Sequence, residues 1–347
     1  MATLMLTVMV AACSDGDSGD DGDGLKRVML LGSNFGDRSF FDSAAGGIAM
    51  MNAQLSDYVT AEIVDVGPDT TVYTSAVLDA SDQNPDIIIV GTWNMNGPVN
   101  EAAPSNPDIK YVIFDDAIDD LDNVYSVLFR VNEGSYLAGM IAAEASESGV
   151  IGFVGGMDNT PIIWDFLVGY ILGAQYINPD IQVLVAYTND FTDPARGKEL
   201  ALAMINNNNA DVLFGVAGLS GTGVIEAGAE TQTYIIGVDG DQAAQYEGRP
   251  EQEWIISSSL KNVNNAIFYA VQRYVVDGVF NSGHDVLGLE HNAVGVVIDN
   301  NTRRVVGQDF IDRVLEVEEE IRSGSRKVAS AWEISEADVA ALVASVS

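Results

Sequence analysis

Four charged residues stand where predicted strands end or helices begin. Asp115 ends the apolar run YVIFD, Asp239 follows the run YIIGV, Lys261 follows SSSL at a helix start, and Asp37 lies in the first polar loop. Aspartate oxygens accept hydrogen bonds from hydroxyl or N–H groups, and a lysine donates them. These residues therefore suit the capture of a small polar molecule. Two other interpretations are open: helix capping or loop solvation by the aspartates, and hydrolysis by paired aspartates.

Four aromatic residues lie in similar places. Phe40 and Phe41 follow the first loop, Trp93 lies in the loop GTWN, and Phe214 ends a strand just before a glycine turn. An aromatic face binds a flat ring by stacking, which contributes roughly 1–3 kcal/mol per ring. These residues are candidates for such a contact, and ordinary core packing is the alternative for each phenylalanine.

The glycine-rich turn that contains Gly218 and Leu219 offers backbone N–H groups at the start of a helix, where a hydroxyl or an anion can bind. It does not match two enzyme motifs. Glu226 stands where a dinucleotide fingerprint needs its next glycine, and Thr222 stands where a nucleophile elbow needs its last one. The sequence thus predicts binding without catalysis.

Short β-branched runs alternate with helix-length segments from Lys26 onward. Continuously apolar strands indicate a parallel sheet that is covered on both faces, and repeated β-α-β order indicates doubly wound sheets. The predicted strands are Arg27–Leu31, Tyr58–Asp65, Asp86–Val90, Ile109–Phe114, Val150–Val154, Ile181–Tyr187, Asp211–Phe214 and Tyr234–Val238. The predicted helices are Ser39–Leu55, Pro161–Ile177, Pro194–Asn206 and Lys261–Val279.

The chain also repeats one pattern. Val28–Gly47 and Ile151–Ala174 both read as an apolar strand, glycine, a polar loop and a helix that begins with aromatic or apolar residues. Open α/β sheets bind ligands at the carboxyl ends of their strands, so two such lobes facing each other would enclose a ligand. Two unrelated tandem domains are the alternative, but no Pro/Ser-rich linker separates the halves.

Composition excludes several classes of function. The 347 residues carry a net charge of −35, which repels nucleic acid and anionic lipid. Cys13 is the single cysteine, and His284 and His291 are the two histidines, so neither an internal disulfide nor a Cys/His zinc site can form. We expect no metal, no cofactor and no nucleic-acid partner.

The first 25 residues predict an exported, tethered protein. Met1–Ala12 is an apolar run of signal-peptide length, shorter than the about 20 residues that span a bilayer. It ends in small residues before Cys13, like a bacterial lipobox, although no basic residue precedes Lys26. We expect a signal peptide and lipidated cysteine at 1–13 and a disordered acidic tether at 14–25, made mainly of Ser, Asp and Gly.

A series of motifs from Val28 to Gly324 resembles the basic membrane protein family of ABC-transporter substrate-binding lipoproteins, which includes purine nucleoside receptors. Their order and spacing carry the resemblance better than any single motif does. The motifs are DRSF at 37–40, YVIFD at 111–115, NEGSYLAGMIAA at 132–143, GFVGG at 152–156, FLVGYILGA at 166–174, NDFTDPARGK at 189–198, DVLFGVAGLSGTG at 211–223, IGVDGDQ at 236–242 and SSSLK at 257–261.

The resemblance implies an α/β type I periplasmic binding protein fold, with two doubly wound parallel-sheet lobes joined by three crossovers. The crossings are expected near Asn123–Arg130, Ile255–Leu260 and His291–Ile298. One lobe would then comprise residues 26–125 with 260–293, and the other 126–259 with 294–330. Residues 331–347 would form a C-terminal tail or helix.

The resemblance also implies roles for the candidate residues. Phe214 matches the position that stacks on a base, with Phe40 or Phe41 on the opposite face. Asp239 and Lys261 would grip the sugar, while Asp37 and Asp115 would accept from base N–H groups. The family commonly has asparagine where Phe41 stands, so Trp93 and Trp164 are candidates to complete the aromatic wall.

The predicted function is that of a substrate-binding lipoprotein for an ABC importer. It would capture a nucleoside-like molecule, foremost a purine nucleoside, between its lobes and deliver it to a membrane permease. The protein would lie at the periplasmic or extracytoplasmic face, held to the membrane by lipid. A nucleoside hydrolase and a ligand sensor for a membrane signalling partner are the alternatives.

Overall fold

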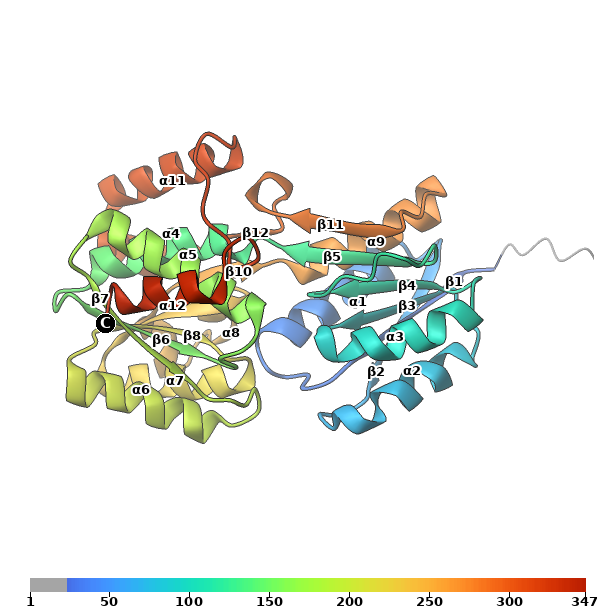
Figure 1. The fold of residues 1–347 in the computed structure, drawn as a ribbon, viewed down its shortest axis with the longest axis horizontal. Coiled ribbons are helices and arrows are strands. Elements are labelled where there is room, and N and C mark those ends of the chain that lie inside the picture. Colours follow the sequence, from blue (N-terminus) through green and yellow to red (C-terminus); the bar gives the residue numbers. More distant parts are fainter. Residues whose placement is uncertain (1–23) are drawn as a thin grey trace, which may run out of the picture.

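The computed structural model describes residues 24–347, which form two α/β lobes that lie side by side (Figure 1). Each lobe is built on a six-stranded sheet. The predicted fold class, two α/β lobes with helices between parallel strands, is confirmed.

Lobe 1 consists mainly of the first part of the chain. Its strands are β1 (Lys26–Gly32), β2 (Val59–Asp65), β3 (Ile87–Gly91), β4 (Lys110–Phe114), β5 (Val124–Phe129) and β11 (Gly283–Leu287), and its helices are α1 (Phe40–Gln54), α2 (Tyr73–Ser81), α3 (Asn96–Ala102) and α9 (Val263–Asp277). Side chains alternate across the sheet: Val28 and Leu30 pack toward α1, whereas Met29 and Leu31 pack toward α2 and α3. Both faces are therefore buried.

Lobe 2 has the same construction. Its strands are β6 (Val150–Gly155), β7 (Gln182–Tyr187), β8 (Val212–Val216), β9 (Tyr234–Asp239), β10 (Ile255–Lys261) and β12 (Val294–Val296), and its helices are α4 (Val131–Ala145), α5 (Pro161–Ile177), α6 (Pro194–Asn208), α7 (Leu219–Thr231), α8 (Gln242–Gln245), α10 (Asn300–Val306), α11 (Gln308–Arg322) and α12 (Glu336–Ala344). Phe153 and Phe214 pack with α4 and α5, while Leu213 packs with α6 and α7.

The two sheets have matching strand orders, β11-β5-β4-β3-β1-β2 and β12-β10-β9-β8-β6-β7. Every neighbouring pair is parallel except β10 and β12, which are antiparallel. The carboxyl ends of the central strands of both sheets therefore carry loops of the same kind, and these loops build the site described below.

The chain passes between the sheets three times. It leaves β5 at Arg130, leaves β10 at Asn262, and runs through 288–293 between β11 and β12. The boundaries expected at residues 125 and 259 fall inside β5 and β10, because each strand continues its sheet to its last residue before the chain crosses.

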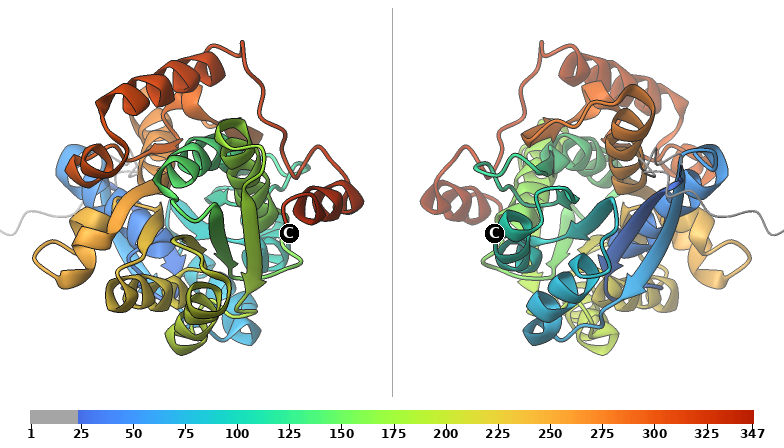
Figure 2. Two further views of the ribbon diagram at one scale, coloured as in Figure 1. Left: turned by 90° about the vertical axis from the view of Figure 1, so that its left-hand side faces the viewer. Right: turned by 90° about the vertical axis from the view of Figure 1, so that its right-hand side faces the viewer.

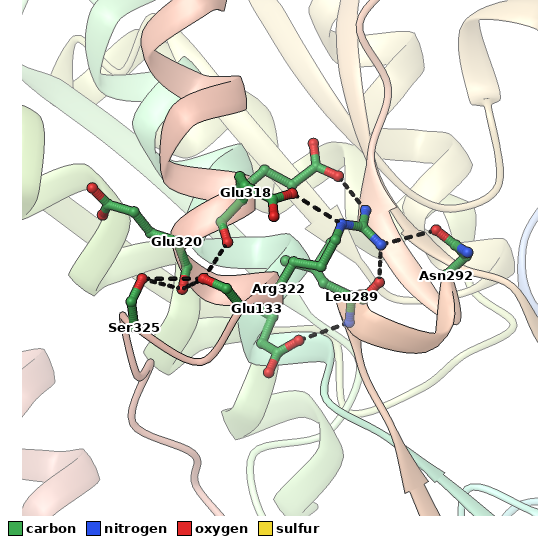
Figure 3. A network of polar contacts seen from close by, with 9 residues as sticks. Glu133, Leu289, Asn292, Glu318, Glu320, Arg322 and Ser325 are labelled. Atoms are coloured by element: carbon green, nitrogen blue, oxygen red, sulfur yellow. Dashed lines mark hydrogen bonds and ion pairs between the residues drawn. The ribbon is translucent and has the colours of Figure 1, made fainter.

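The third crossing is fixed to lobe 2 by two side chains (Figure 3). The Leu289 N–H donates to Glu133 Oε2 at 2.8 Å. From α11, Arg322 donates to the Leu289 carbonyl and to Asn292 Oδ1, and it also pairs with Glu318 at 2.6 Å. These contacts hold the crossing on α4 and α11.

The C-terminal segment folds back onto lobe 2. Figure 2 shows α11 and α12 on different sides of that lobe. Val339 of α12 and Ala331 pack against Val168 of α5, and the Val183 N–H at the edge of the sheet donates to the Val346 carbonyl at 2.8 Å. The segment expected as a tail or helix thus contains a helix that covers α5.

Candidate ligand-binding cleft

A cavity of about 420 Å³ lies between the lobes at the carboxyl ends of the central strands. Both sheets contribute loops to its wall, as expected for facing α/β lobes. All but one of the predicted ligand-binding residues line it: Asp37, Phe40, Phe41, Trp93, Asp115, Gly218, Leu219, Asp239 and Lys261.

A buried charge cluster forms one wall. Lys261 Nζ lies 2.6 Å from Asp115 Oδ2 and 3.6 Å from Asp239 Oδ1, and all three side chains are buried. Because Asp115 lies in lobe 1 while Lys261 and Asp239 lie in lobe 2, this cluster joins the lobes. Ser39 of lobe 1 adds a second link, since its hydroxyl donates to Asp239 Oδ2.

Both aspartates occupy the left-handed backbone region, with φ of 65° at Asp115 and 64° at Asp239. Non-glycine residues seldom adopt this conformation, and aspartate and asparagine do so more often than most other types.

The cluster leaves negative charge available. Burial acts to lower the pKa of Lys261, but the carboxylates of Asp115 and Asp239 outweigh it and raise that pKa, so the lysine stays charged. Burial raises the pKa of Asp115, and Lys261 opposes this. One oxygen of each aspartate, Oδ1, is buried without a hydrogen-bond partner among the described residues. Buried oxygens of this kind need a donor, which a ligand can supply.

Asp37 has a different set of contacts. One of its oxygens accepts from the Ser39 and Asp42 N–H groups, and the other accepts from the Phe41 N–H. These bonds cap the start of α1. Burial raises the pKa of Asp37 to about 6, against the lowering effect of the three N–H donors. Its place in the wall is as predicted, while its contacts are those of the capping alternative.

Aromatic rings form the other walls. The Phe40 ring lies 4.3 Å from Lys261 Nζ, and Phe166 of α5 lies 5.7 Å from the same atom. Trp93 of lobe 1 and Phe191 of lobe 2 face each other across the cleft with ring centroids 6.0 Å apart. Phe41 is mostly buried and makes edge contacts with Phe40 at 5.0 Å.

The prediction for Phe214 is corrected by the structure. Its side chain is fully buried, packs on the rings of Phe153, Phe166 and Tyr170, and does not line the cavity. The ring points to the α4–α5 face of β8, two residues before the strand ends, while the cavity begins at Val216. Trp164, a candidate for the aromatic wall, does not line the cavity either and packs with the C-terminal segment.

Phe166 and Phe191 line the cavity but were not predicted as binding residues. Phe166 begins one of the motifs behind the family resemblance, and Phe191 lies inside another, NDFTDPARGK. An aromatic residue in the loop after a buried strand was therefore a usable signal for Phe191. Phe166 lies inside an apolar helix, where pattern alone does not separate a wall residue from a core residue.

Gly218 and Leu219 lie where β8 passes into α7. Gly218 has φ 54° and ψ −130°, and α7 begins at Leu219. The start of this 13-residue helix faces the cavity and brings backbone N–H groups to it.

Two further observations concern residues 24–347. No helix there is both long and apolar enough to cross a bilayer. No group of three or more His, Cys, Asp or Glu side chains in that range is arranged to hold a metal ion.

Comparison with known proteins identifies the family. Residues 25–329 match the family model of PnrA-like ABC transporter substrate-binding proteins. The ABC transporter nucleoside-binding protein BmpA of Lactococcus lactis is 31% identical, over 87% of this chain and 91% of its own. Basic membrane protein B of Borreliella burgdorferi is 32% identical, over 83% and 87% respectively.

Solved structures agree. The solute-binding protein of an ABC transporter system from Aeropyrum pernix K1 superposes with a TM-score of 0.80 at 28% identity, over 93% of this chain and 98% of that one. ABC substrate-binding proteins are extracytoplasmic, bind small molecules and interact with a transporter permease. The resemblance read from the motifs is confirmed, and the chain belongs to the family of PnrA-like ABC transporter substrate-binding proteins.

Proposed function

We propose that this protein captures a nucleoside-like molecule, foremost a purine nucleoside, in the cleft between its lobes. One observation carries the proposal. The cleft presents two buried carboxylates, Asp115 and Asp239, beside aromatic walls. The Oδ1 atom of each accepts no hydrogen bond from the described residues, and Lys261 Nζ comes no closer than 3.6 Å to Asp239 Oδ1. A nucleoside has a flat base and a vicinal diol, and so it offers both a ring to stack and hydroxyl and N–H donors to these oxygens.

The groups divide between base and sugar. Asp239 and Lys261 bind the diol, because a carboxylate accepts from hydroxyls and the ammonium donates to them. Asp115 accepts from a base N–H. The base lies between Phe40 of lobe 1 and Phe166 of lobe 2, which takes the position first expected of Phe214. Trp93 and Phe191 lie across the cleft from each other and shield the bound ligand.

Two facts favour this ligand class. A relative from Lactococcus lactis, similar over most of both chains, is named as a nucleoside-binding protein. The titratable groups in the wall are mostly acidic, with Asp37, Asp115, Asp190 and Asp239 against Lys261. A neutral nucleoside suits this wall better than a nucleotide, whose phosphates would be repelled.

Thermal shift and calorimetry test the proposal. We expect purine nucleosides to raise the melting temperature and to bind one to one, whereas free ribose and nucleotides give no comparable shift. A stronger response to a different ligand class would refute the nucleoside assignment.

The protein binds its ligand without chemical change. Chromatography of a nucleoside recovered after long incubation tests this, since the hydrolase alternative requires free base and free ribose to accumulate. A role as a ligand sensor predicts the same binding, and it would be recognised by coupling to a signalling partner rather than to a permease.

A lipid anchor at Cys13 completes the proposal. Cys13 lies outside the described residues, and the support comes from the lipobox-like sequence before it and the Ser/Asp/Gly segment after it. Fractionation of cells that express the protein or its Cys13→Ser variant tests the anchor. The unaltered protein should sediment with membranes, and the variant should not.

A further inference from the structure

A second contact between the lobes lies outside the ligand cavity. It joins Arg38, in the loop before α1 of lobe 1, to α8 and Tyr246 of lobe 2. The Arg38 carbonyl accepts from Gln242 Nε2 at 2.9 Å, and the guanidinium donates to the Gln245 carbonyl at 3.3 Å. The same guanidinium lies over the Tyr246 ring, 4.5 Å from its centroid.

Lobe 1 holds Arg38 in place before the contact forms. Its backbone has φ 54°, and its N–H donates to Asp42 Oδ2 at 2.9 Å. The Gly36 N–H donates to the other oxygen of Asp42 at 2.7 Å. The loop is therefore fixed by its own lobe, and the Arg38 carbonyl points toward lobe 2 without help from a ligand.

Lobe 2 holds its side of the contact equally firmly. Gln242 Oε1 accepts from the Val238 N–H at 3.0 Å, so the amide is oriented with its Nε2 toward lobe 1. The Gln242 N–H donates to Ser258 Oγ at 3.2 Å. Gln242 and Tyr246 are both buried. The Arg38 carbonyl and the Gln242 amide are thus ordered before the lobes meet, and the Arg38 guanidinium is the group that must be ordered on closure.

Arg38, Gln242, Gln245 and Tyr246 are absent from the cavity wall. The contact therefore gains nothing from the ligand directly, and it exists only when the lobes are together. A contact of this kind shifts the balance between open and closed forms whether or not a ligand is bound, and it raises the apparent affinity for any ligand that needs the closed form.

We infer that Arg38 and Gln242 are positioning residues that latch the two lobes together and slow ligand release. For the ligand-bound state the inference rests on the proposed function, while closure of the ligand-free protein does not depend on it. The latch sets how long any ligand is held, whereas the cavity residues set which ligand is chosen.

The test compares Arg38→Ala with Arg249→Ala in the full chain. Arg249 is a matched control, because it lies 5.7 Å from the same Tyr246 ring but comes from lobe 2 itself and is exposed. Stopped-flow release of inosine should be about 10-fold faster in Arg38→Ala, the size expected when a hydrogen bond and a cation–π contact are lost. Arg249→Ala should stay within about twofold of the unaltered protein.

A double-mutant cycle locates the coupling. Tyr246→Leu should also speed release, and Arg38→Ala should have a smaller effect in the Tyr246→Leu background than in the unaltered protein, because only the hydrogen bond to the Gln245 carbonyl is then left to lose. The relative affinities for inosine, adenosine and guanosine should not change in any of these variants, which separates a latch from a cavity residue. Arg38→Lys keeps the positive charge but lacks the planar guanidinium group, so it should release inosine at an intermediate rate.

Small-angle X-ray scattering of the ligand-free protein tests the latch independently of any ligand. Arg38→Ala should have a larger radius of gyration than both the unaltered protein and Arg249→Ala. Unchanged inosine release in Arg38→Ala, or an equal effect of Arg249→Ala, would overturn the latch. If no nucleoside binds the unaltered protein, the proposed function fails, and scattering alone decides the latch: equal radii would overturn it.

Discussion

Two places in this protein bury aspartate, and they do so in different ways. On α5, Asp165 is fully buried, and the chain itself supplies donors to both of its oxygens. Its Oδ1 accepts from the Ser330 hydroxyl at 2.6 Å and from the Ala331 N–H at 2.8 Å, and its Oδ2 accepts from the Asn132 N–H at 3.2 Å. In the cleft, Asp115 and Asp239 are almost as buried, yet Oδ1 of each accepts no hydrogen bond from residues 24–347, and Asp239 Oδ1 has only the 3.6 Å approach of Lys261 Nζ.

Hydrogen bonding therefore distinguishes a carboxylate that stabilises the fold from one that is available to a ligand. Residue type and burial are the same in both places. What differs is whether the folded chain satisfies every oxygen, because a buried acceptor without a donor carries a desolvation penalty that something else must relieve. Asp165 ties the C-terminal segment and the first crossing to α5, whereas Asp115 and Asp239 keep hydrogen-bonding capacity for a ligand.

The largest expected effect comes from Asp239→Asn. We expect purine nucleoside affinity to fall at least about 100-fold, because one charge-assisted acceptor of the diol is replaced by an amide. Lys261 keeps Asp115 as its partner, so the melting temperature should change little. Calorimetry and thermal unfolding measure the two effects. Retained affinity would show that Asp239 does not bind the ligand, and that its lack of a hydrogen bond at Oδ1 does not mark a binding residue.

Asp165→Ala should give the opposite pattern. Three buried donors lose their acceptor, and we expect the free energy of unfolding to fall by about 3 kcal/mol. The affinity of the folded protein should stay within a few-fold of normal. Denaturant unfolding and calorimetry on the same samples check this. A 100-fold loss of affinity with unchanged stability would show that Asp165 is not structural.

The pH dependence of the free energy of unfolding gives a further test of the structural role of Asp165. Burial raises the pKa of Asp165 to about 6, and the bonds from Ser330, Ala331 and Asn132 oppose that rise. Between about pH 4 and pH 6 the folded state then holds a proton that the unfolded state has lost, so this residue adds stability as the pH falls.

The Asp165→Asn variant isolates that contribution. The stability of the unaltered protein relative to the variant should rise by about 1 kcal/mol as the pH falls from 6 to 5, because a group with a pKa of about 6 is only half protonated at pH 6. Asp37, whose burial also raises its pKa to about 6, is present in both proteins and cancels in the difference. Denaturant unfolding in matched buffers measures the slope. A flat difference would mean that Asp165 is ionised throughout this range.

The smallest expected effect separates two phenylalanines that touch each other. Phe166 lines the cavity and Phe214 packs behind it, with ring centroids 6.2 Å apart. Phe166→Leu should weaken nucleoside binding about 5-fold through lost stacking. Phe214→Leu should leave affinity unchanged and lower stability by about 1 kcal/mol. The reverse result would restore Phe214 as the stacking residue.

Much of the fold could be read from the sequence. The apolar runs predicted the central strands, as for Tyr234–Val238 within β9, and helix α5 has the predicted bounds. Four strands were not among the predicted ones: β5 and β10, which occupy the segments expected as crossings, and β11 and β12. β11 is half exposed and contains His284 and Asp285, and β12 has three residues, so neither shows the apolar pattern of a central strand.

The sequence also predicted most of the residues that line the cleft, and the prediction for Phe214 was wrong. Asp115, Asp239 and Lys261 follow buried strands, and parallel strands bring such residues to one edge. Phe214 also lies near a strand end, but it stands two residues before the end of β8, so its ring packs in the core behind Phe166, whereas Val216 at the strand end reaches the cavity.

Local elements, net charge and the residue types at the strand ends follow from the order of amino acids alone, because these properties depend on neighbours along the chain. The tertiary structure decided which of those residues share a cleft. It placed Ser39 and Arg38 of one lobe against Asp239 and Gln242 of the other, across about 200 residues of chain. It also decided which buried carboxylates keep an oxygen without a hydrogen bond. Two of the three donors to Asp165, from Ser330 and Ala331, come from a segment about 165 residues away, and no local pattern records such a distance.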